Sequence, residues 1–365
     1  MKKTVLILTA LAVSACGITA FADTLRGDIN SDGAVNRSDC TVLTDYLLTK
    51  SAEIPFPEAD LDGNGRLNAK DLTLLKRRIL QQNQQSSSEA HMSGSAYMQQ
   101  VRESFVMQIP QNLHRGGEVQ HITYFSQQAN REKGAHVWLP PGYSASEQYP
   151  VMYVNHGIFG NEFSMVGDFK IVDSAATLIE SGDAVPMIIV FTSMYTNPNK
   201  ENCDGITAEE EPFYDAFLED LTECLMPYIA AHYPVKSGRE NTAVAGFSMG
   251  GRESLYIGVS RPDLFGYIGA TSPAPGVFPA VDQFFEHPGS MPAEQFRISA
   301  PYEPYLLMIA GGTDDGMVNV APENYSKQLT ANGTDHIFIS VPGGGHDGTT
   351  GEPLFYNFIR ALFKA

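Results

Sequence analysis

From about residue 97 to the C-terminus, short apolar runs alternate with longer segments whose apolar residues recur at helical spacing. Apolar runs of about four to eight residues are typical of buried strands, whereas recurrence every three or four residues is typical of helices. Their alternation predicts an α/β domain with a mostly parallel central sheet. The predicted strands are residues 119–126, 135–139, 151–155, 187–192, 242–245, 267–270, 305–310 and 337–341, and the predicted helices are 171–181, 213–232, 249–259, 323–331 and 354–363.

The first 22 residues have the pattern of a secretory signal peptide. Two lysines precede a short apolar run at 5–13, and Ala20-Phe21-Ala22 forms an A-x-A cleavage site. The apolar run is well short of the roughly 20 residues that span a bilayer. We therefore expect residues 1–22 to direct secretion, with no membrane span elsewhere in the chain. Cys16 ends a lipoprotein-box-like sequence and is the alternative, lipidated start of the mature protein.

The next segment, residues 23–82, contains two copies of one loop pattern. Each copy places oxygen-bearing side chains at loop positions 1, 3, 5, 9 and 12, glycine at position 6 and a backbone carbonyl at position 7. This spacing wraps a short loop around a calcium ion, which takes six to eight oxygen ligands. The predicted ligands are Asp28, Asn30, Asp32, Ala34, Asn36 and Asp39 in the first copy, and Asp60, Asp62, Asn64, Arg66, Asn68 and Asp71 in the second.

Each loop leads into one amphipathic helix, and the two loop-helix units resemble a type I dockerin. The resemblance implies a small all-α domain with two structural calcium ions, whose partner is a cohesin domain of a scaffoldin. In dockerins, loop positions 10 and 11 contribute to cohesin contact. These positions hold Arg37 and Ser38 in one copy and Ala69 and Lys70 in the other. Residues 83–96 follow as a polar, flexible linker, so that 97–365 forms the second domain.

Charge and cysteine content narrow the range of functions. The 365 residues include 42 acidic and 24 basic side chains, a formal net charge of -18. Such an acidic chain lacks the basic surface of a nucleic-acid-binding protein or of a partner for anionic membranes. The chain has four cysteines, too few for a disulfide-stapled scaffold. Cys203 and Cys224 either form one disulfide or remain as two thiols.

A G-x-S-x-G sequence, Gly246-Phe-Ser248-Met-Gly250, lies between a predicted strand and a predicted helix. In this setting the motif forms a nucleophile elbow, which exposes the serine hydroxyl at the carboxyl end of the strand. The helix that follows has its N-terminus beneath Ser248, where it favours the negative charge that develops during acyl transfer. Ser248 is therefore the candidate nucleophile.

A base and an acid follow Ser248 at the ends of later strands. His346 lies in a glycine-rich loop after the last predicted strand, and Asp314 and Asp315 follow the strand before it. One of these carboxylates is expected to accept the imidazole N–H and orient the ring. The order serine, aspartate, histidine is that of α/β-hydrolases.

The oxyanion hole of such a site uses two backbone N–H groups. One belongs to Met249, directly after the nucleophile, and the other to the loop that follows strand 151–155. His156, in that loop, occupies the wrong place in the chain order for the triad base, so we expect it to be a structural residue. We expect the acidic run at 209–211 to be a solvated helix start.

The second domain resembles the esterase D family and, within it, carbohydrate esterase family 1, which contains feruloyl and acetylxylan esterases. The resemblance runs from about residue 115 to the C-terminus and implies an α/β-hydrolase fold with no catalytic cofactor. It implies Ser248 as nucleophile, His346 as base and Asp315 as acid, with Asp314 the less favoured acid, and Ile158 as the second oxyanion donor. The motifs that carry it are Leu139-Pro-Pro-Gly142-Tyr143, Tyr149-Pro-Val151, His156-Gly157, Pro186-Met-Ile-Ile-Val190, Met226-Pro-Tyr228, Tyr233-Pro234 and Gly246-Phe-Ser-Met-Gly-Gly251.

Together these patterns predict a secreted, cellulosome-associated serine carboxylesterase that removes ester groups from xylan or another plant-wall hemicellulose. Feruloyl esters are the first expectation and acetylated xylan the second. The same fold also hosts acyltransferases of the mycolyltransferase type. A binding module on an inactive hydrolase fold is the non-enzymatic alternative, which the intact serine, aspartate and histidine set disfavours.

Overall fold

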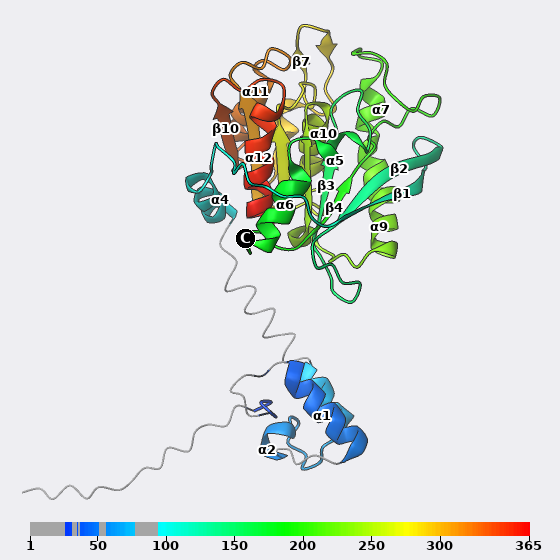
Figure 1. Ribbon diagram of the computed structural model, residues 1–365, viewed down its shortest axis with the longest axis vertical. Helices are drawn as coiled ribbons and strands as arrows, with labels where there is room; N and C mark the ends of the chain where they lie inside the picture. Colours follow the sequence, from blue (N-terminus) through cyan, green and yellow to red (C-terminus); the bar gives the residue numbers. More distant parts are fainter. Residues whose placement is uncertain (1–25, 31–34, 36, 51–55, 77–93) are drawn as a thin grey trace, which may run out of the picture. The chain divides into compact units, whose positions relative to one another are not determined.

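The chain forms two compact units, Met1–His91 and Met92–Ala365, each of which is described by itself. The expected signal peptide and its Cys16 alternative lie outside the described residues, as does most of the expected linker 83–96. The last residues assigned to that linker are helical, because helix α4 begins at Gly94 and buries Tyr97. The computed structural model describes residues 26–30, 35, 37–50, 56–76 and 94–365 (Figure 1).

The smaller unit is all-α in its described residues. Helix α1 spans Arg37–Thr49, the short helix α2 spans Phe56–Ala59, and residues 69–76 are helical. One apolar residue from each part of this unit points into a small core, and these residues become almost fully buried. They are Ile29, Leu43, Ala59 and Leu75.

The larger unit is built around an eight-stranded sheet with the order β1-β2-β4-β3-β5-β6-β9-β10. Strands β1 and β2 form an antiparallel hairpin at one edge, β2 pairs antiparallel with β4, and the remaining neighbours are parallel. The sheet is thus mostly parallel, as the sequence predicts. The strands are β1 (Glu118–Ser126), β2 (Arg131–Leu139), β3 (Val151–Asn155), β4 (Ile188–Phe191), β5 (Thr242–Phe247), β6 (Tyr267–Thr271), β9 (Leu306–Gly312) and β10 (Ile337–Val341).

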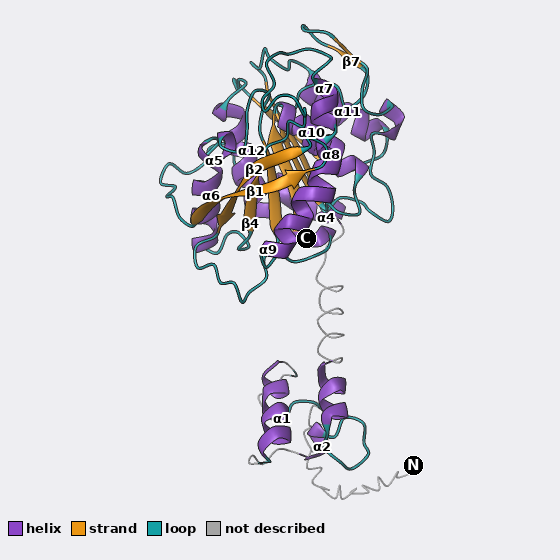
Figure 2. Ribbon diagram, turned by 90° about the vertical axis from the view of Figure 1, so that its right-hand side faces the viewer, coloured by secondary structure: helices purple, strands orange, loops and turns teal. Residues whose placement is uncertain are grey.

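Helices cover both faces of this sheet, as the two views show (Figures 1 and 2). Side chains alternate between the faces, so Tyr153 packs in one core cluster while Met152 and Val154 pack in the other. Both faces of the strand are buried, which explains its continuous apolar run. The helices on one face are α4 (Gly94–Glu103), α6 (Ile171–Glu180) and α12 (Gly348–Ala361), and those on the other include α10 (Met249–Ser260) and α11 (Ala321–Ala331).

The predicted helix 213–232 is not continuous. A π-helical turn, Asp220–Leu225, interrupts it, and helix α9 (Met226–His232) follows with a proline in its first turn. A proline has no N–H for the regular helical ladder, which favours the change of hydrogen-bond register at this point. The turn contains Asp220, whose carboxylate pairs with the fully buried Lys133 at 2.6 Å. Helices α7 (Glu211–Asp215) and α8 (Phe217–Glu219) precede the π-helical turn.

The segment between β6 and β9 contains a two-stranded hairpin that the sequence pattern does not reveal. Its strands, β7 (Ala280–Val281) and β8 (Glu286–His287), are only two residues long and pair antiparallel.

Elsewhere in the larger unit, Cys203 and Cys224 are free thiols, so the disulfide alternative is not realised. No helix in the described part of the chain is long and apolar enough to cross a membrane.

Candidate active site

Ser248 stands in a sharp turn between β5 and α10, with φ 57° and ψ -119°. A non-glycine residue with this backbone conformation is strained and persists only where its surroundings enforce it. Two glycines make the turn possible. A Cβ on Gly246 would lie 2.3 Å from the Gly250 carbonyl oxygen, and one on Gly250 would lie 2.3 Å from that of Asn155. The G-x-S-x-G pattern therefore forms the elbow because its glycines let strand and helix touch.

His346 joins Ser248 to Asp315 through its two ring nitrogens. Its Nε2 lies 2.9 Å from the Ser248 Oγ, and its Nδ1 lies 2.9 Å from the Asp315 Oδ2. The three side chains, which are separated by up to 98 positions along the chain, thus form one hydrogen-bonded series. A serine hydroxyl hydrogen-bonded to an imidazole whose other nitrogen donates to a buried carboxylate is the arrangement that activates a nucleophile.

The structure distinguishes the two adjacent carboxylates. Asp315 is buried, and its Oδ1 accepts backbone N–H groups of Met317 at 3.0 Å and Val318 at 3.3 Å. Burial alone would raise the pKa of Asp315, but the hydrogen bond from His346 and the other donors outweigh it, so the pKa lies below its ordinary value. Asp314 is exposed and accepts from the hydroxyl of Thr313. Asp315 is therefore the carboxylate that faces the histidine.

Hydrogen bonds donated by backbone N–H groups join the loops after β9 and β10 and hold the acid and the histidine close together. Asp314 donates its N–H to the carbonyl of Gly344 at 2.9 Å, and Gly343 donates its N–H to the Thr313 hydroxyl at 2.8 Å. These contacts continue the parallel pairing of the two strands past their ends. The loops therefore behave as an extension of the sheet.

The two expected oxyanion donors, Ile158 and Met249, line the same cavity as Ser248. Among the described residues, no hydrogen-bond acceptor is paired with either backbone N–H. The loop that carries Ile158 passes directly over the nucleophile, since a Cβ on Gly157 would lie 3.6 Å from the Ser248 Cβ. Two N–H groups without a partner beside an activated hydroxyl are suited to hold a developing oxyanion.

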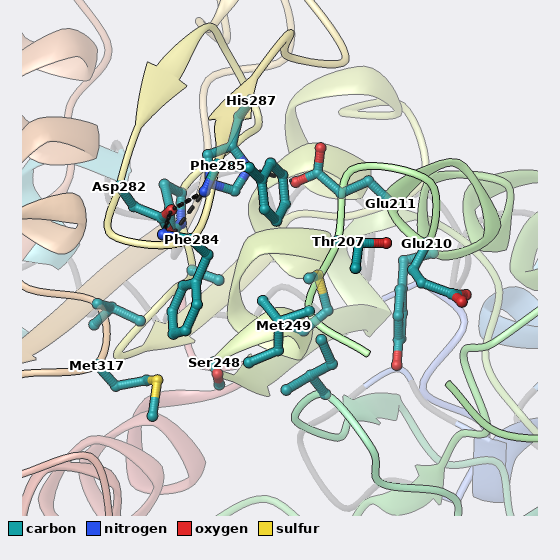
Figure 3. A pocket seen from close by; sticks show the side chains of 16 residues that line it. Thr207, Glu210, Glu211, Ser248, Met249, Asp282, Phe284, Phe285, His287 and Met317 are labelled. Carbon is teal, nitrogen blue, oxygen red and sulfur yellow. Dashed lines mark hydrogen bonds and ion pairs between the residues drawn. The ribbon is translucent and has the colours of Figure 1, made fainter. Parts of the chain in front are cut away.

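The cavity above Ser248 is lined mainly by apolar side chains (Figure 3). Phe284 and Phe285 come from the β7–β8 hairpin, and Met317 comes from the loop after β9. Sequence reasoning missed these residues, because the segment around them has neither helical nor strand periodicity. The lining residues are Ile158, Ile206, Thr207, Glu210, Glu211, Tyr214, Ser248, Met249, Ala274, Pro275, Asp282, Phe284, Phe285, His287, Met317 and Val318.

A buried histidine fastens the hairpin to helix α7. The Nδ1 of His287 lies 2.6 Å from the Glu211 carboxylate, and its Nε2 lies 3.2 Å from that of Asp282. The expectation that the run 209–211 is solvated is therefore wrong for Glu211, which is 4% exposed. Its carboxylate is buried because it has a histidine partner, which the local acidic sequence does not indicate.

The second predicted calcium loop gathers its carboxylates at one point. Oxygens of Asp60, Asp62 and Asp71 all lie within 4.8 Å of one another, and Asp71 is fully buried. Asn64 and Asn68 lie in the same loop and hydrogen-bond to the Asp60 and Asp71 carboxylates through their backbone N–H groups. Such a set of oxygen donors fits a hard cation such as calcium.

In the first loop, Asp28 and Asp39 are buried, and Asp39 accepts the backbone N–H of Ile29 and Asn30. The other predicted ligands of this loop, Asp32, Ala34 and Asn36, lie outside the described residues. The arrangement repeats in the second loop, where Asp71 accepts the backbone N–H of Asp62.

The four positions expected to contact a cohesin lie at the starts of two helices. Arg37 and Ser38 are the first residues of α1, and Ala69 and Lys70 begin the helical segment 69–76. Lys70 pairs with Asp62 of its own loop at 2.9 Å.

Comparison with family models assigns both units. Residues 126–349 match the Esterase family, and residues 26–80 match the dockerin type I domain. A solved structure of a CE1 ferulic acid esterase from Anaeromyces mucronatus, in complex with ferulic acid, is 37% identical to this chain. The match covers 72% of this chain and 98% of that one, with a TM-score of 0.68.

Two curated relatives are longer proteins. An endo-1,4-beta-xylanase/feruloyl esterase of Xylanibacter ruminicola is 36% identical over 162 residues, which are 43% of this chain and 22% of that protein. An endo-1,4-beta-xylanase Y of Acetivibrio thermocellus is 27% identical over 264 residues, which are 67% of this chain and 23% of that protein. The chain thus spans less than a quarter of the length of either relative.

Proposed function

Because the chain belongs to the esterase family and carries a type I dockerin domain, we propose that it is a serine carboxylesterase that removes feruloyl groups from xylan. The observation that carries this proposal is the hydrogen-bonded series of Ser248, His346 and Asp315, whose serine lines a mainly apolar cavity. The nucleophile, its base and an acyl pocket are thus in one place, as ester hydrolysis through an acyl-enzyme requires.

In the proposed reaction, His346 takes the proton of the Ser248 hydroxyl as its oxygen attacks the ester carbonyl. The negative oxygen of the tetrahedral intermediate accepts the N–H groups of Ile158 and Met249. Asp315 holds the ring in the tautomer that presents an unprotonated Nε2 and stabilises the imidazolium that forms. His346 then protonates the leaving sugar oxygen, and a water molecule activated by the same ring releases the acid from Ser248.

An aromatic acyl group fits this site better than an acetyl group. Phe284, Phe285 and Met317 line the cavity beside Ser248, and an acetyl group would leave most of this apolar surface unused. The comparison with the Anaeromyces mucronatus enzyme, which was solved with ferulic acid, supports the same choice.

Two assays on the full chain test the acyl preference. We expect kcat/KM for methyl ferulate to exceed that for methyl acetate by at least about 100-fold, since the apolar contacts of one aromatic ring contribute a few kcal/mol. Release of ferulate from feruloylated arabinoxylan and of acetate from acetylated xylan gives the matched polymer comparison. Acetate release at the higher kcat/KM would replace the feruloyl proposal with that of an acetylxylan esterase.

For the smaller unit we propose two structural calcium ions, a cohesin domain as partner and an extracellular, cellulosome-associated location. The paired loops support this proposal, because the second gathers the carboxylates of Asp60, Asp62 and Asp71 and the first contains the buried Asp28 and Asp39. Without a cation, such clustered carboxylates repel one another, so calcium binding is expected to contribute to folding.

Removal of calcium from the full chain is expected to abolish binding to an immobilised type I cohesin and to leave the hydrolysis of methyl ferulate unchanged. The two functions separate because the carboxylate cluster and the Ser248 site belong to different compact units. Surface plasmon resonance with and without a chelator measures the first effect, and a rate assay measures the second. Cohesin binding that persists in the chelator, or that magnesium restores as well as calcium does, contradicts the calcium assignment.

A further inference from the structure

The loop between β3 and α5 (Ser164–Gly167) carries Ile158, and one peptide group sets the direction of its N–H. The carbonyl of Gly157 and the N–H of Ile158 belong to the same planar peptide and point in opposite directions. A hydrogen bond that fixes the direction of the Gly157 carbonyl therefore also fixes the opposite direction of the Ile158 N–H.

His156 holds the Gly157 oxygen most closely. The Nδ1 of His156 lies 2.6 Å from the Gly157 carbonyl oxygen, and its Nε2 accepts the backbone N–H of Met194 at 3.0 Å. The side chain is fully buried. Because Nε2 accepts, Nδ1 carries the proton and donates it to the carbonyl. Hydrogen bonds thus fix the ring at both nitrogens. The bond from Nδ1 is made to the peptide group that contains the Ile158 N–H.

The rest of the loop does not hold this peptide as firmly. The Gly160 N–H also donates to the Gly157 oxygen, at the longer distance of 3.1 Å. Phe159, at the third position of this turn, has φ 63°, a conformation that a bulky side chain rarely adopts. A Cβ on Gly160 would lie 2.8 Å from the His156 Nδ1, so the turn closes tightly around the ring. A strained turn of this kind keeps its shape only with support from its neighbours.

We propose that His156 is a positioning residue of the oxyanion hole, which donates from Nδ1 to the Gly157 carbonyl and thereby aims the Ile158 N–H at the oxygen of the reacting ester. The inference rests on the proposed function, since it assigns a role within the same reaction. His156 touches neither the ester nor Ser248 and acts only through the peptide that it holds.

The environment of His156 keeps the ring in the form that this role needs. Burial lowers the pKa of His156 to about 4, so the ring is neutral across the pH range in which an esterase works. A neutral imidazole has one donor and one acceptor, which matches the carbonyl of Gly157 and the N–H of Met194. An imidazolium would place a proton at Nε2, facing the Met194 N–H.

Two amide replacements separate positioning from packing. In His156→Asn the amide nitrogen occupies the place of Nδ1 and can donate to Gly157, whereas in His156→Gln the amide lies near the place of Nε2. We expect the Asn variant to keep kcat for methyl ferulate within about threefold of the native value. We expect the Gln variant to lose about 10- to 100-fold in kcat with little change in KM, because a misaimed donor fails only in the transition state.

A second readout follows the oxyanion directly. A boronic acid forms a charged tetrahedral adduct with the serine, whereas free ferulate binds the acyl pocket without one. The Gln variant is expected to weaken boronate inhibition by the same factor as kcat and to leave ferulate inhibition unchanged. His336→Gln is the matched control, because this buried histidine also pairs through Nδ1 with a backbone carbonyl, that of Thr334, outside the active site.

The outcomes separate the two proposals. If the native chain hydrolyses no ester and its Ser248 does not react with a fluorophosphonate, the proposed function fails. If the native chain is active but the Gln and Asn variants have equal kcat, the positioning role is wrong. A measurement without any variant also tests the positioning role. If Nδ1 donates to the Gly157 carbonyl, ¹⁵N-histidine NMR of the native protein must show His156 protonated at Nδ1. An Nε2-protonated ring overturns the inference even if the Gln variant does not fold.

Discussion

Replacement of Ser248 by alanine is expected to lower kcat for methyl ferulate by about 10⁶-fold while the protein stays folded. The loss is this large because the Ser248 Oγ, 2.9 Å from the His346 Nε2, is the atom that forms the acyl-enzyme. Alanine also fits the elbow, since Gly246 and Gly250 and not the serine side chain allow the close approach of strand and helix. Circular dichroism and a steady-state rate assay measure the two expectations.

Ser260→Ala, at the other end of the same helix, is the matched control and should retain full activity. A fluorophosphonate should label the native chain and the Ser260 variant but not the Ser248 variant. If the Ser248 variant kept more than about one-hundredth of native kcat, the nucleophile would be a different group.

The second large effect concerns the two adjacent aspartates. Asp315→Asn is expected to lower kcat by about 10⁴-fold, because an amide in place of the carboxylate favours the wrong tautomer of His346 and cannot stabilise its imidazolium. Asp314→Asn makes the same chemical change one residue away, on an exposed side chain that does not face the ring. It should change kcat by less than about threefold, because a screened surface charge contributes little.

Kinetics of the two variants with methyl ferulate decide which aspartate is the acid of the triad. The comparison is matched, because each variant loses one negative charge. Equal losses would mean that the negative charge of the loop matters and not a particular hydrogen bond. A larger loss for the Asp314 variant would transfer the acid to that residue.

The sequence predicts the sheet well, because the central parallel strands β3, β4 and β9 are nearly continuous apolar runs. All eight strands of the central sheet fall within a few residues of their expected positions. The positions of Ser248, Asp315 and His346 at strand ends follow from the same regularity, since parallel strands bring their carboxyl ends to one edge. The local sequence pattern is thus enough to locate side chains such as Ser248, Asp315 and His346, whose positions depend on the ends of the strands.

The sequence does not predict the aromatic residues of the cavity, because they lie outside the long, periodic elements. Phe284 and Phe285 lie on a hairpin with strands two residues long, which is too short for an alternating pattern. The burial of Glu211 depends on His287, a partner 76 positions away. The break in the predicted helix 213–232 has one local signal, Pro227, but the pairing of Asp220 in the π-helical turn with Lys133 of a distant strand has none. Long-range polar pairs of this kind leave no local signal.

The sequence predicts that His156 is a structural residue, but it does not indicate which groups the ring contacts. Its chain position excludes it from the triad, but the contact of its Nδ1 with the Gly157 carbonyl appears only in the folded structure. The tautomer depends on the Met194 N–H, 38 positions further along the chain.

The hydrogen-bonded loops after β9 and β10 hold the acid and the histidine independently of the hairpin residues that line the cavity. Asp315 and His346 are tied to adjacent strands, whereas the aromatic wall comes from the segment inserted between β6 and β9. For the proposed esterase, mutations that lengthen, shorten or replace the β7–β8 hairpin are therefore expected to change which ester is hydrolysed without disturbing the pairing of Asp315 with His346. The residues that set acyl selectivity and the residues that carry out the reaction therefore lie in different segments. Natural or engineered changes in the hairpin can alter selectivity while Asp315 and His346 stay in place.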